Sequence, residues 1–250
     1  MNSICSPTET GTAMAILGEK TSALERSATL TDQVLEAILR GAIERRIPFG
    51  ARLVEAEIAQ ELNVSRVPVR EALRLLCSQG LVENQPYKGM CLMTVDDRML
   101  NETLTVRHHL EGLAVKLAVK NLRLGRKNML GLLDALDAMK QAHDLGSAAD
   151  MAASDVGFHR AILHMADSDT LTFIWETLAR KFQVIVGIAW YANDQDRIYE
   201  QHVKLVDLFK TKDEVAILAF LEPHIMEGVE LGPSGTAGKT TGKPSKRAAG

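Results

Sequence analysis

GARLVEAEIAQELNVSRVPVREALRLLCSQGLVENQPYKG, residues 50–89, decides the fold of the first part of this 250-residue chain. Apolar residues recur every three or four positions over 55–62, which predicts a short helix with one buried stripe. A second helix begins at Ser65, whose hydroxyl can accept a hydrogen bond from a free first-turn N–H. Pro68 is tolerated in that first turn. Two short helices joined by a tight turn and followed by a hairpin predict a DNA-reading unit.

The outer side of the second helix carries Ser65, Arg66 and Arg70 near the N-terminal end. A recognition helix touches base edges and phosphates of the major groove with this end. Arginine suits the role because its planar fork can donate to both O6 and N7 of guanine. The alternative is that these arginines, together with Arg74, form an ordinary solvated helix face.

The run VSRVPVREAL, followed by QGLVENQPYKG, resembles the winged helix-turn-helix of the GntR family of bacterial transcription regulators. The resemblance covers about residues 30–93, with a further supporting helix from Leu30. It implies that the contacts to operator DNA come from the start of the second helix and from the wing tip. Those residues are Ser65, Arg66 and Arg70, which read the operator, and Lys88 and Gly89, which enter or border the minor groove.

One position departs from the family pattern. Many relatives carry an arginine or another polar contact residue early in the helix before the turn, where this chain has Ala56. A phosphate contact is therefore either missing or supplied by Arg52.

Composition is ordinary for a globular protein, with 46% hydrophobic residues. The longest nearly uninterrupted apolar run, 184–191, is far too short to span a bilayer, and the polar N-terminus lacks a signal-peptide pattern. We therefore expect a cytoplasmic protein with no membrane partner. Cys5, Cys77 and Cys91 form an odd set without metal-ligand spacing, which favours free thiols.

The net charge of -3 is unevenly distributed. Residues 29–94, the expected DNA-binding domain, carry eight basic and eight acidic groups, so attraction to phosphate must come from a few placed groups. Residues 95–230 carry 15 basic and 21 acidic groups, and a net negative charge of this kind disfavours binding to nucleic acid. The polar segments 1–28 and 231–250 are expected to be disordered, and the basic 231–250 segment can add weak non-specific DNA affinity.

No strand pattern recurs after the hairpin. Helical periodicity, interrupted by Gly and Asp/Asn-containing breaks, predicts helices over about 95–122, 126–145, 148–166, 168–191, 195–211 and 213–230. The chain is therefore expected to be mainly α, with an N-terminal winged helix-turn-helix and a C-terminal all-α bundle of six helices.

Four potential metal ligands fall within the predicted bundle. Asp155 and His159 stand four residues apart, so both leave the same face of one helix. His202 and His224 lie on two other predicted helices, and each taken singly reads as an ordinary core histidine. Together they offer three imidazoles and one carboxylate, a plausible ligand set for Zn²⁺, with Ni²⁺ or Mn²⁺ also suited.

Residues from about Leu100 to Val229 resemble the FCD effector-binding domain of many GntR-type regulators. The resemblance implies that Asp155, His159, His202 and His224 hold a divalent cation beside a pocket for a small organic acid, and that six helices place the chain nearer the VanR-type than the FadR-type branch. It also aligns an R-x3-E pair, Arg107 and Glu111. Arg107 is then either a partner for the effector carboxylate or simply an ion-pair partner of Glu111.

These features favour a homodimeric, ligand-responsive transcription factor, a repressor of a catabolic or transport operon that senses a small, aromatic or other organic carboxylate. An alternative is a metallohydrolase that uses the three histidines and Asp155, although a general base beside the ligands is missing. A third is a constitutive architectural DNA-binding protein whose bundle serves only to dimerise.

Overall fold

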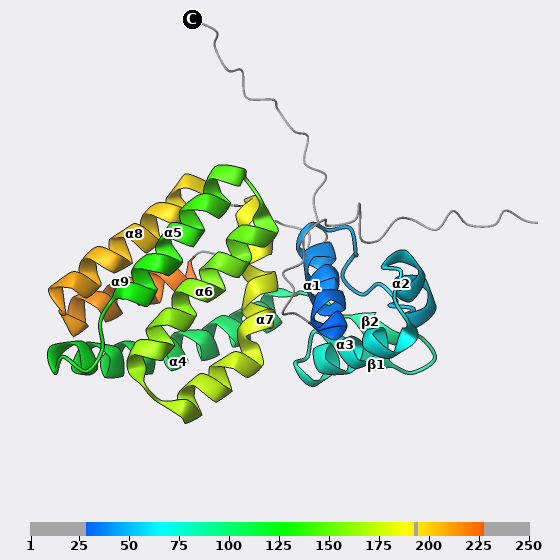
Figure 1. The fold of residues 1–250 in the computed structure, drawn as a ribbon, viewed down its shortest axis with the longest axis horizontal. Helices are drawn as coiled ribbons and strands as arrows, with labels where there is room; N and C mark the ends of the chain where they lie inside the picture. Colours follow the sequence, from blue (N-terminus) through cyan, green and yellow to red (C-terminus); the bar gives the residue numbers. More distant parts are fainter. Residues whose placement is uncertain (1–28, 193–194, 228–250) are drawn as a thin grey trace, which may run out of the picture. The chain divides into compact units, whose positions relative to one another are not determined.

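The computed structural model describes residues 29–192 and 195–227, and it contains two compact units (Figure 1). The first unit comprises the described residues up to Cys77 together with Val82–Leu92. The second comprises Ser78–Leu81 and the described residues from Met93 onward. The expected tails, 1–28 and 231–250, lie outside the described residues.

The first unit has the order helix, helix, helix, hairpin. Helix α1 (Leu30–Ile43) begins with a capping box, in which the Thr29 hydroxyl accepts from Asp32 N and the Asp32 carboxylate accepts from Thr29 N. Helices α2 (Glu55–Glu61) and α3 (Arg66–Ser78) follow, and then strands β1 (Val82–Gln85) and β2 (Gly89–Leu92). The strands are antiparallel, with Val82 opposite Leu92 and Gln85 opposite Gly89. This is the predicted winged helix-turn-helix.

A third extended segment supports the hairpin. Arg52 forms an isolated antiparallel bridge with Cys91, and Leu53 N donates to Met90 O at 2.8 Å. The core beneath is made of buried aliphatic side chains from all three helices and the hairpin. They include Val34, Ile38, Ile58, Val69, Leu73, Leu76, Val82 and Leu92. The recognition helix is thus fixed by its apolar face.

The second unit contains six helices among the described residues, as predicted, and no strand there. They are α4 (Asp97–Arg123), α5 (Leu130–Leu145), α6 (Ala148–Ala166), α7 (Asp169–Ala192), α8 (Gln195–Thr211) and α9 (Glu214–Met226). Side-chain caps set several of the starts. Asp96 accepts from Met99 N, Ser147 from Asp150 N, and Asp213 from Val215 N.

The predicted start of α5 at residue 126 is wrong by four residues. Gly125 adopts a positive φ of 67°, and the Asn128 side chain accepts a hydrogen bond from Leu130 N, so a short loop replaces the first predicted turn. The predicted last turn of α9 extends to residues 228–230, which lie outside the described residues.

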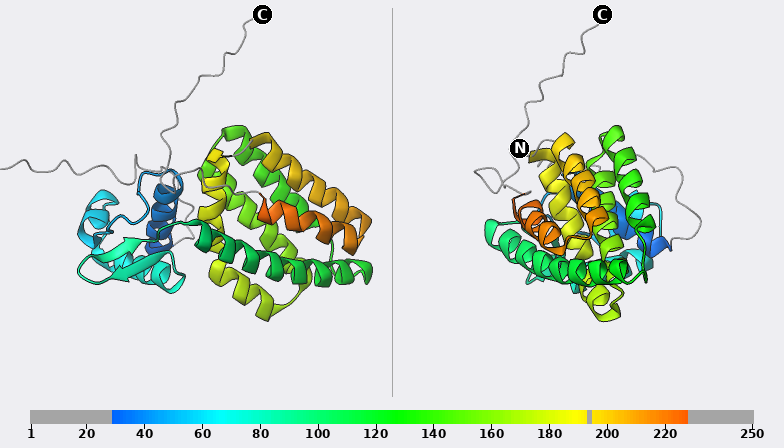
Figure 2. Two further views of the ribbon diagram at one scale, coloured as in Figure 1. Left: turned by 180° about the vertical axis from the view of Figure 1, so that it is seen from behind. Right: turned by 90° about the vertical axis from the view of Figure 1, so that its left-hand side faces the viewer.

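Helix α6 is the central helix of the bundle and packs against α4, α5 and α7 (Figure 2). Helix α9 packs against α4 and α8, and α8 also contacts α5. The largest fully buried side chains of this unit are Trp175, Trp190, Phe158, Phe182 and Phe209. Because three neighbours surround it, α6 presents different side chains to different interfaces around its circumference.

None of the described helices is both long and apolar enough to cross a membrane. Cys77 and Cys91 are free thiols, Cys91 being buried, whereas Cys5 lies outside the described residues.

Candidate functional site

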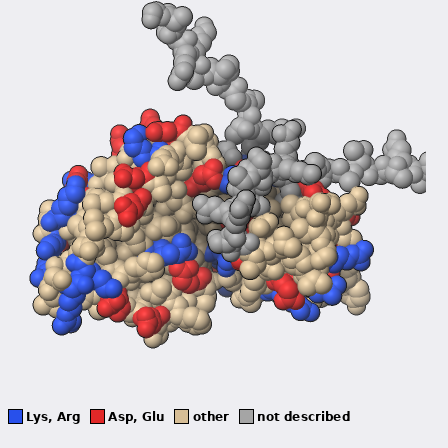
Figure 3. Space-filling view, viewed as in Figure 1, with Lys and Arg blue, Asp and Glu red and all other residues tan. Residues whose placement is uncertain are grey.

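The predicted DNA-reading residues lie on the exposed side of the first unit. Pro68, Val69 and Leu73 are buried, while Ser65, Arg66 and Arg70 are exposed at the start of α3. The structure therefore separates a packing face from a polar face on the same helix. Figure 3 shows basic and acidic side chains interspersed on the visible face, in keeping with the neutral balance of this domain.

Arg70 is held by an acidic partner that sequence analysis missed. Its Nη2 donates to Glu55 Oε2 at 2.9 Å, and its Nε lies 3.2 Å from both carboxylate oxygens. This hydrogen bond lowers the pKa of Glu55 and raises that of Arg70. Glu55 is the first residue of α2, so the pair fixes the direction of the guanidinium across the two helices. No local spacing signals a partner 15 residues away.

The wing brings the other predicted contacts together. Lys88 is exposed at the tip, and Gly89 has a φ of 80°, which favours glycine there. The Arg52 Nε lies 3.9 Å from where a Cβ on Gly89 would stand, so Arg52 reaches the base of the wing. Tyr87, which sequence analysis did not single out, is fully exposed at the tip with a φ of 65°. It adds an aromatic ring to this surface.

In the second unit the four predicted metal ligands converge. Asp155 and His159 come from α6, His202 from α8 and His224 from α9. One ligand atom of each lies within 4.8 Å of all the others. Asp155 Oδ1 is 3.1 Å from His202 Nε2 and 3.9 Å from His159 Nε2, and the Nε2 atoms of His159 and His224 are 3.3 Å apart. Metal–ligand bonds of about 2.1 Å place neighbouring donor atoms about 3.0–3.4 Å apart, so the set fits one ion.

The far sides of the imidazoles are tied to oxygen atoms. His202 Nδ1 lies 2.8 Å from Ile198 O, which can only accept, so this Nδ1 carries the proton. His224 Nδ1 faces Gln201 Oε1 at 3.3 Å. These contacts leave the Nε2 lone pairs of both rings directed at the cluster. Such tautomer-fixing partners are typical of histidines that bind metals.

His159 has the same arrangement with a carboxylate behind it. Its Nδ1 lies 2.6 Å from Glu111 Oε2, and both residues are fully buried. Despite burial, which raises the pKa, Arg107 and His159 lower the pKa of Glu111 to about 2. An ionised carboxylate only accepts, so Nδ1 is the protonated nitrogen and Nε2 is the one that faces Asp155.

The cluster therefore has an excess of acceptors. Three Nε2 lone pairs and the Asp155 carboxylate face one another, and the buried His202 Nε2 has no hydrogen-bond partner in the described part of the chain. Buried acceptors without a donor are unfavourable, and a cation between them would remove that cost. The donor set thus fits a divalent metal ion on its own geometry.

Burial and charge keep the groups in the forms that a metal requires. Burial lowers the pKa of His159, and burial together with the neighbouring histidines holds that of His224 well below its ordinary value. Burial opposes ionisation of Asp155, yet Arg107 and His159 hold its pKa well below the usual range. Neutral imidazoles and an ionised carboxylate are the ligating species.

Arg107 makes an ion pair with Glu111, which was one of the two roles considered for it, and a second ion pair with Asp155. Its Nε donates to Glu111 Oε1 at 2.8 Å and its Nη2 to Asp155 Oδ2 at 3.0 Å. Burial lowers the pKa of Arg107, but these two carboxylates outweigh it and the net shift is upward. Trp175 Nε1 also donates to Glu111 Oε1, at 3.0 Å. Arg107 thus positions Asp155, a candidate metal ligand, directly. Trp175 was not identified from the sequence because it contacts Glu111 from 64 residues away.

A small cavity of about 40 Å³ adjoins the cluster. Its polar wall is formed by Arg107, Asp155, Gln201, His202 and His224, and the rest of the lining is aliphatic. Those aliphatic residues are Leu104, Val186, Ala189, Ile198 and Ile225. A volume of this size accommodates one or two water molecules. An organic acid therefore requires the cavity to widen.

Comparison with known proteins agrees with both parts of the fold. The profile "Bacterial regulatory proteins, gntR family" matches residues 30–92, and that of the FCD domain matches residues 102–227. The chain belongs to the GntR family. It carries an FCD effector-binding domain, and it is a DNA-binding transcription regulator, not an enzyme.

Several relatives align over about four fifths of this GntR-family chain. It is 30% identical to the "Probable D-xylose utilization operon transcriptional repressor" of Paenarthrobacter nicotinovorans, over 79% of this chain and 86% of that protein. It is 27% identical to the gluconate operon transcriptional repressor of Bacillus licheniformis, over 80% of this chain and 84% of that protein. Among solved structures, E. coli McbR/YncC superposes with a TM-score of 0.65 at 26% identity, over 80% of this chain and 95% of that one.

Proposed function

We propose that this regulator is a homodimeric repressor of a catabolic or transport operon that works in the cytoplasm. In this proposal a divalent metal ion and a small organic carboxylate in the FCD domain control binding to operator DNA. The observation that carries the proposal is the convergence of four buried or partly buried ligand atoms in a chain that also has a winged helix-turn-helix. Relatives named as operon repressors support the repressor role.

Asp155, His159, His202 and His224 would hold the ion, and Zn²⁺ suits three imidazoles and one carboxylate. When bound, the ion supplies a Lewis-acid centre that can take one oxygen of a carboxylate. Arg107 orients Asp155 through its Oδ2 and is the one arginine or lysine among the described residues that line this cavity, so its guanidinium could bind the second carboxylate oxygen. The aliphatic wall favours an effector with an apolar body.

The reading surface would be formed by Ser65, Arg66, Arg70, the Arg52 side chain and the Lys88–Gly89 wing tip. In a dimer two such surfaces must match the spacing of two operator half-sites. The dimer would have one separation of these surfaces that matches the operator and another that does not. An effector that binds the second form more tightly lowers operator affinity, and the ratio of its two affinities sets the largest possible change. Since the small cavity must widen to admit an organic acid, the bundle would have one form with the effector bound and another without it.

The metal test uses native mass spectrometry with elemental analysis of the purified full chain. We expect a dimer with about one divalent ion per protomer, and we expect His202→Ala to lose the ion. His109→Ala is the matched control, because His109 is exposed on α4 and outside the cluster. A wild-type protein without stoichiometric metal after growth in metal-supplemented medium contradicts the metal proposal.

The DNA test uses electrophoretic mobility shifts on the fragment upstream of the regulator's own gene. Arg66→Ala should weaken the specific shift, whereas Arg98→Ala, an exposed arginine on α4, should not. If His202→Ala and the wild type respond identically to a panel of organic acids, the chain acts as a constitutive architectural protein instead.

A further inference from the structure

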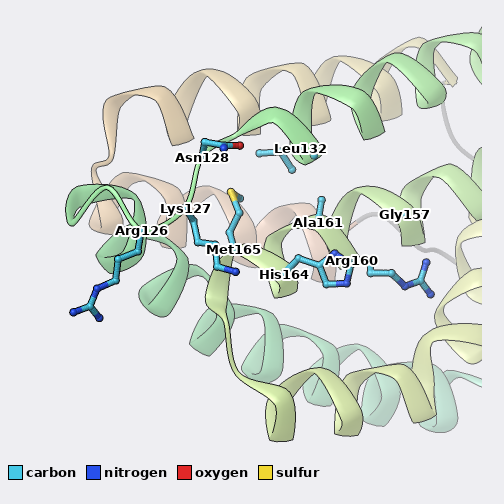
Figure 4. A pocket seen from close by; sticks show the side chains of 10 residues that line it. Arg126, Lys127, Asn128, Leu132, Gly157, Arg160, Ala161, His164 and Met165 are labelled. Atoms are coloured by element: carbon cyan, nitrogen blue, oxygen red, sulfur yellow. The ribbon is translucent and has the colours of Figure 1, made fainter.

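The bundle contains a second and larger cavity, of about 360 Å³. It lies between the loop that joins α4 to α5, the first turn of α5 and the C-terminal half of α6 (Figure 4). Its polar wall consists of Arg126, Lys127, Asn128, Arg160 and His164, and Leu132, Ala161 and Met165 complete it. A volume of this order is sufficient for a small organic ligand.

The lining of this basic cavity carries no acidic residue, although residues 95–230 have a net charge of -6. Two of the basic residues form ion pairs with carboxylates that do not line the cavity. Lys127 Nζ lies 2.7 Å from Asp167 Oδ1, and Arg160 Nη2 lies 3.0 Å from Glu176 Oε2. Arg126 extends from the rim and makes no ion pair with a described residue (Figure 4). Among the described lining residues, Arg126 therefore leaves one unbalanced positive charge at the rim of a concave surface, which favours a negatively charged ligand.

Two glycines keep the basic cavity open. Gly131 lies in the first turn of α5 and Gly157 in the middle of α6, where glycine is less favourable than alanine. A Cβ at either position would meet no atom within 4 Å. Close packing therefore does not require glycine there. What the missing side chains provide is space at the wall of the cavity.

The basic cavity is separate from the metal cluster. Asp155 and His159 leave one face of α6, and at about 100° per residue Gly157, Arg160 and His164 leave the opposite face. The two sites share a helix but no residue. A ligand in the basic cavity would therefore contact the back of the helix that carries two of the four metal ligands.

We propose that this basic cavity binds a small phosphorylated metabolite, with the organic part against Leu132, Ala161 and Met165. The phosphate group would lie at Lys127, and Arg126 would reach it by turning its side chain inward from the rim. Arg and Lys side chains are the usual phosphate-binding groups of proteins, and a phosphate carries close to two negative charges at neutral pH. Free phosphate shares that chemistry and lacks the organic part. The site is independent of the metal and effector functions proposed above.

Isothermal titration of the 250-residue protein tests the proposal with three probes, glucose 6-phosphate, inorganic phosphate and glucose. We expect saturable binding of glucose 6-phosphate, weaker binding of inorganic phosphate and none of glucose. The double variant Arg126→Ala/Lys127→Ala should weaken glucose 6-phosphate binding by about tenfold or more, because charge-assisted hydrogen bonds are lost. The matched control is Arg197→Ala/Lys204→Ala, which removes two exposed cations of α8 outside the cavity.

A second variant tests whether the probe binds inside the basic cavity. Gly157→Leu fills the wall with a good helix former, and we expect a folded protein by circular dichroism that no longer binds glucose 6-phosphate. His202→Ala should bind the probe as the wild type does, which separates this site from the metal cluster. Absence of saturable binding to the wild type overturns the proposal, and so does equal binding by the wild type and the Arg126→Ala/Lys127→Ala variant.

Discussion

Replacing Glu111 by glutamine should weaken metal binding by the candidate cluster without changing its shape. Glu111 is fully buried, its Oε1 accepts from Arg107 and Trp175, and its Oε2 lies 2.6 Å from His159 Nδ1. In Glu111→Gln the amide oxygen can keep the Arg107 and Trp175 hydrogen bonds. The NH₂ group then faces His159 Nδ1, so the ring must move its proton to Nε2 and loses its ligating lone pair.

The structure also gives the size of the stability effect. The pKa of Glu111 falls from 4.5 to about 2 on folding, and at about 1.4 kcal/mol per unit the ionised form contributes about 3 kcal/mol to the free energy of unfolding. Because the pKa is lowered in the folded state, this contribution is complete above about pH 4.5 and is lost as the pH falls toward 2. The difference between wild type and Glu111→Gln should shrink across that window.

Two assays separate these effects. Urea unfolding of EDTA-treated protein measures the free energy of unfolding, and competition with a chromogenic chelator measures metal affinity, for which we expect a loss of about 10- to 100-fold. Glu102→Gln makes the same chemical change at an exposed residue of α4 that pairs with Arg98, and it should alter the free energy of unfolding by less than about 1 kcal/mol. Wild-type metal affinity in Glu111→Gln would refute the role of Glu111 in fixing the His159 tautomer.

Three further outcomes are expected. Glu55→Gln releases the Arg70 guanidinium and removes a negative charge from the reading surface, so non-specific DNA affinity at low salt should rise. Fluorescence anisotropy should show a larger rise than in the control Glu57→Gln, and equal effects would contradict this. Leu73→Ala empties a buried position of α3 and should cost about 2–5 kcal/mol in denaturant unfolding, whereas Leu75→Ala, at a 43% exposed position, should cost less than about 1 kcal/mol. Removal of metal with EDTA should lower Tm, since an ion present at 100 times its Kd stabilises the fold by about 2.7 kcal/mol; an unchanged Tm would mean that no ion is bound.

Features that depend on nearby residues were predictable from the sequence. The bounds 148–166 were predicted for α6 and are those observed, because Ser147 caps the helix and apolar periodicity continues to its end. The Asp155 and His159 pair followed from a four-residue spacing on that helix. The start of α5 was missed because its N-cap, Met129, makes no side-chain cap hydrogen bond, and the Asn128 side chain accepts from Leu130 N one residue before it.

Contacts between distant segments were not predictable in the same way. The Glu55–Arg70 and Glu111–Trp175 hydrogen bonds join residues 15 and 64 positions apart, and each depends on how two helices pack. The convergence of His202 and His224 with α6 was expected from the resemblance to a known domain. Periodicity alone gives the face of each helix but not its neighbour, so it did not reveal the basic cavity either.

The distribution of the four ligands along the chain has a topological consequence for the bundle. His159 and His224 are 65 residues apart in sequence, and their Nε2 atoms are 3.3 Å apart. An ion held by both would close a long loop, much as a disulfide does, and would restrict the unfolded chain in the same way. Unlike a disulfide, such a cross-link forms and breaks with the metal supply, so the hold on α9, the last described helix, would follow the availability of the ion in the cell.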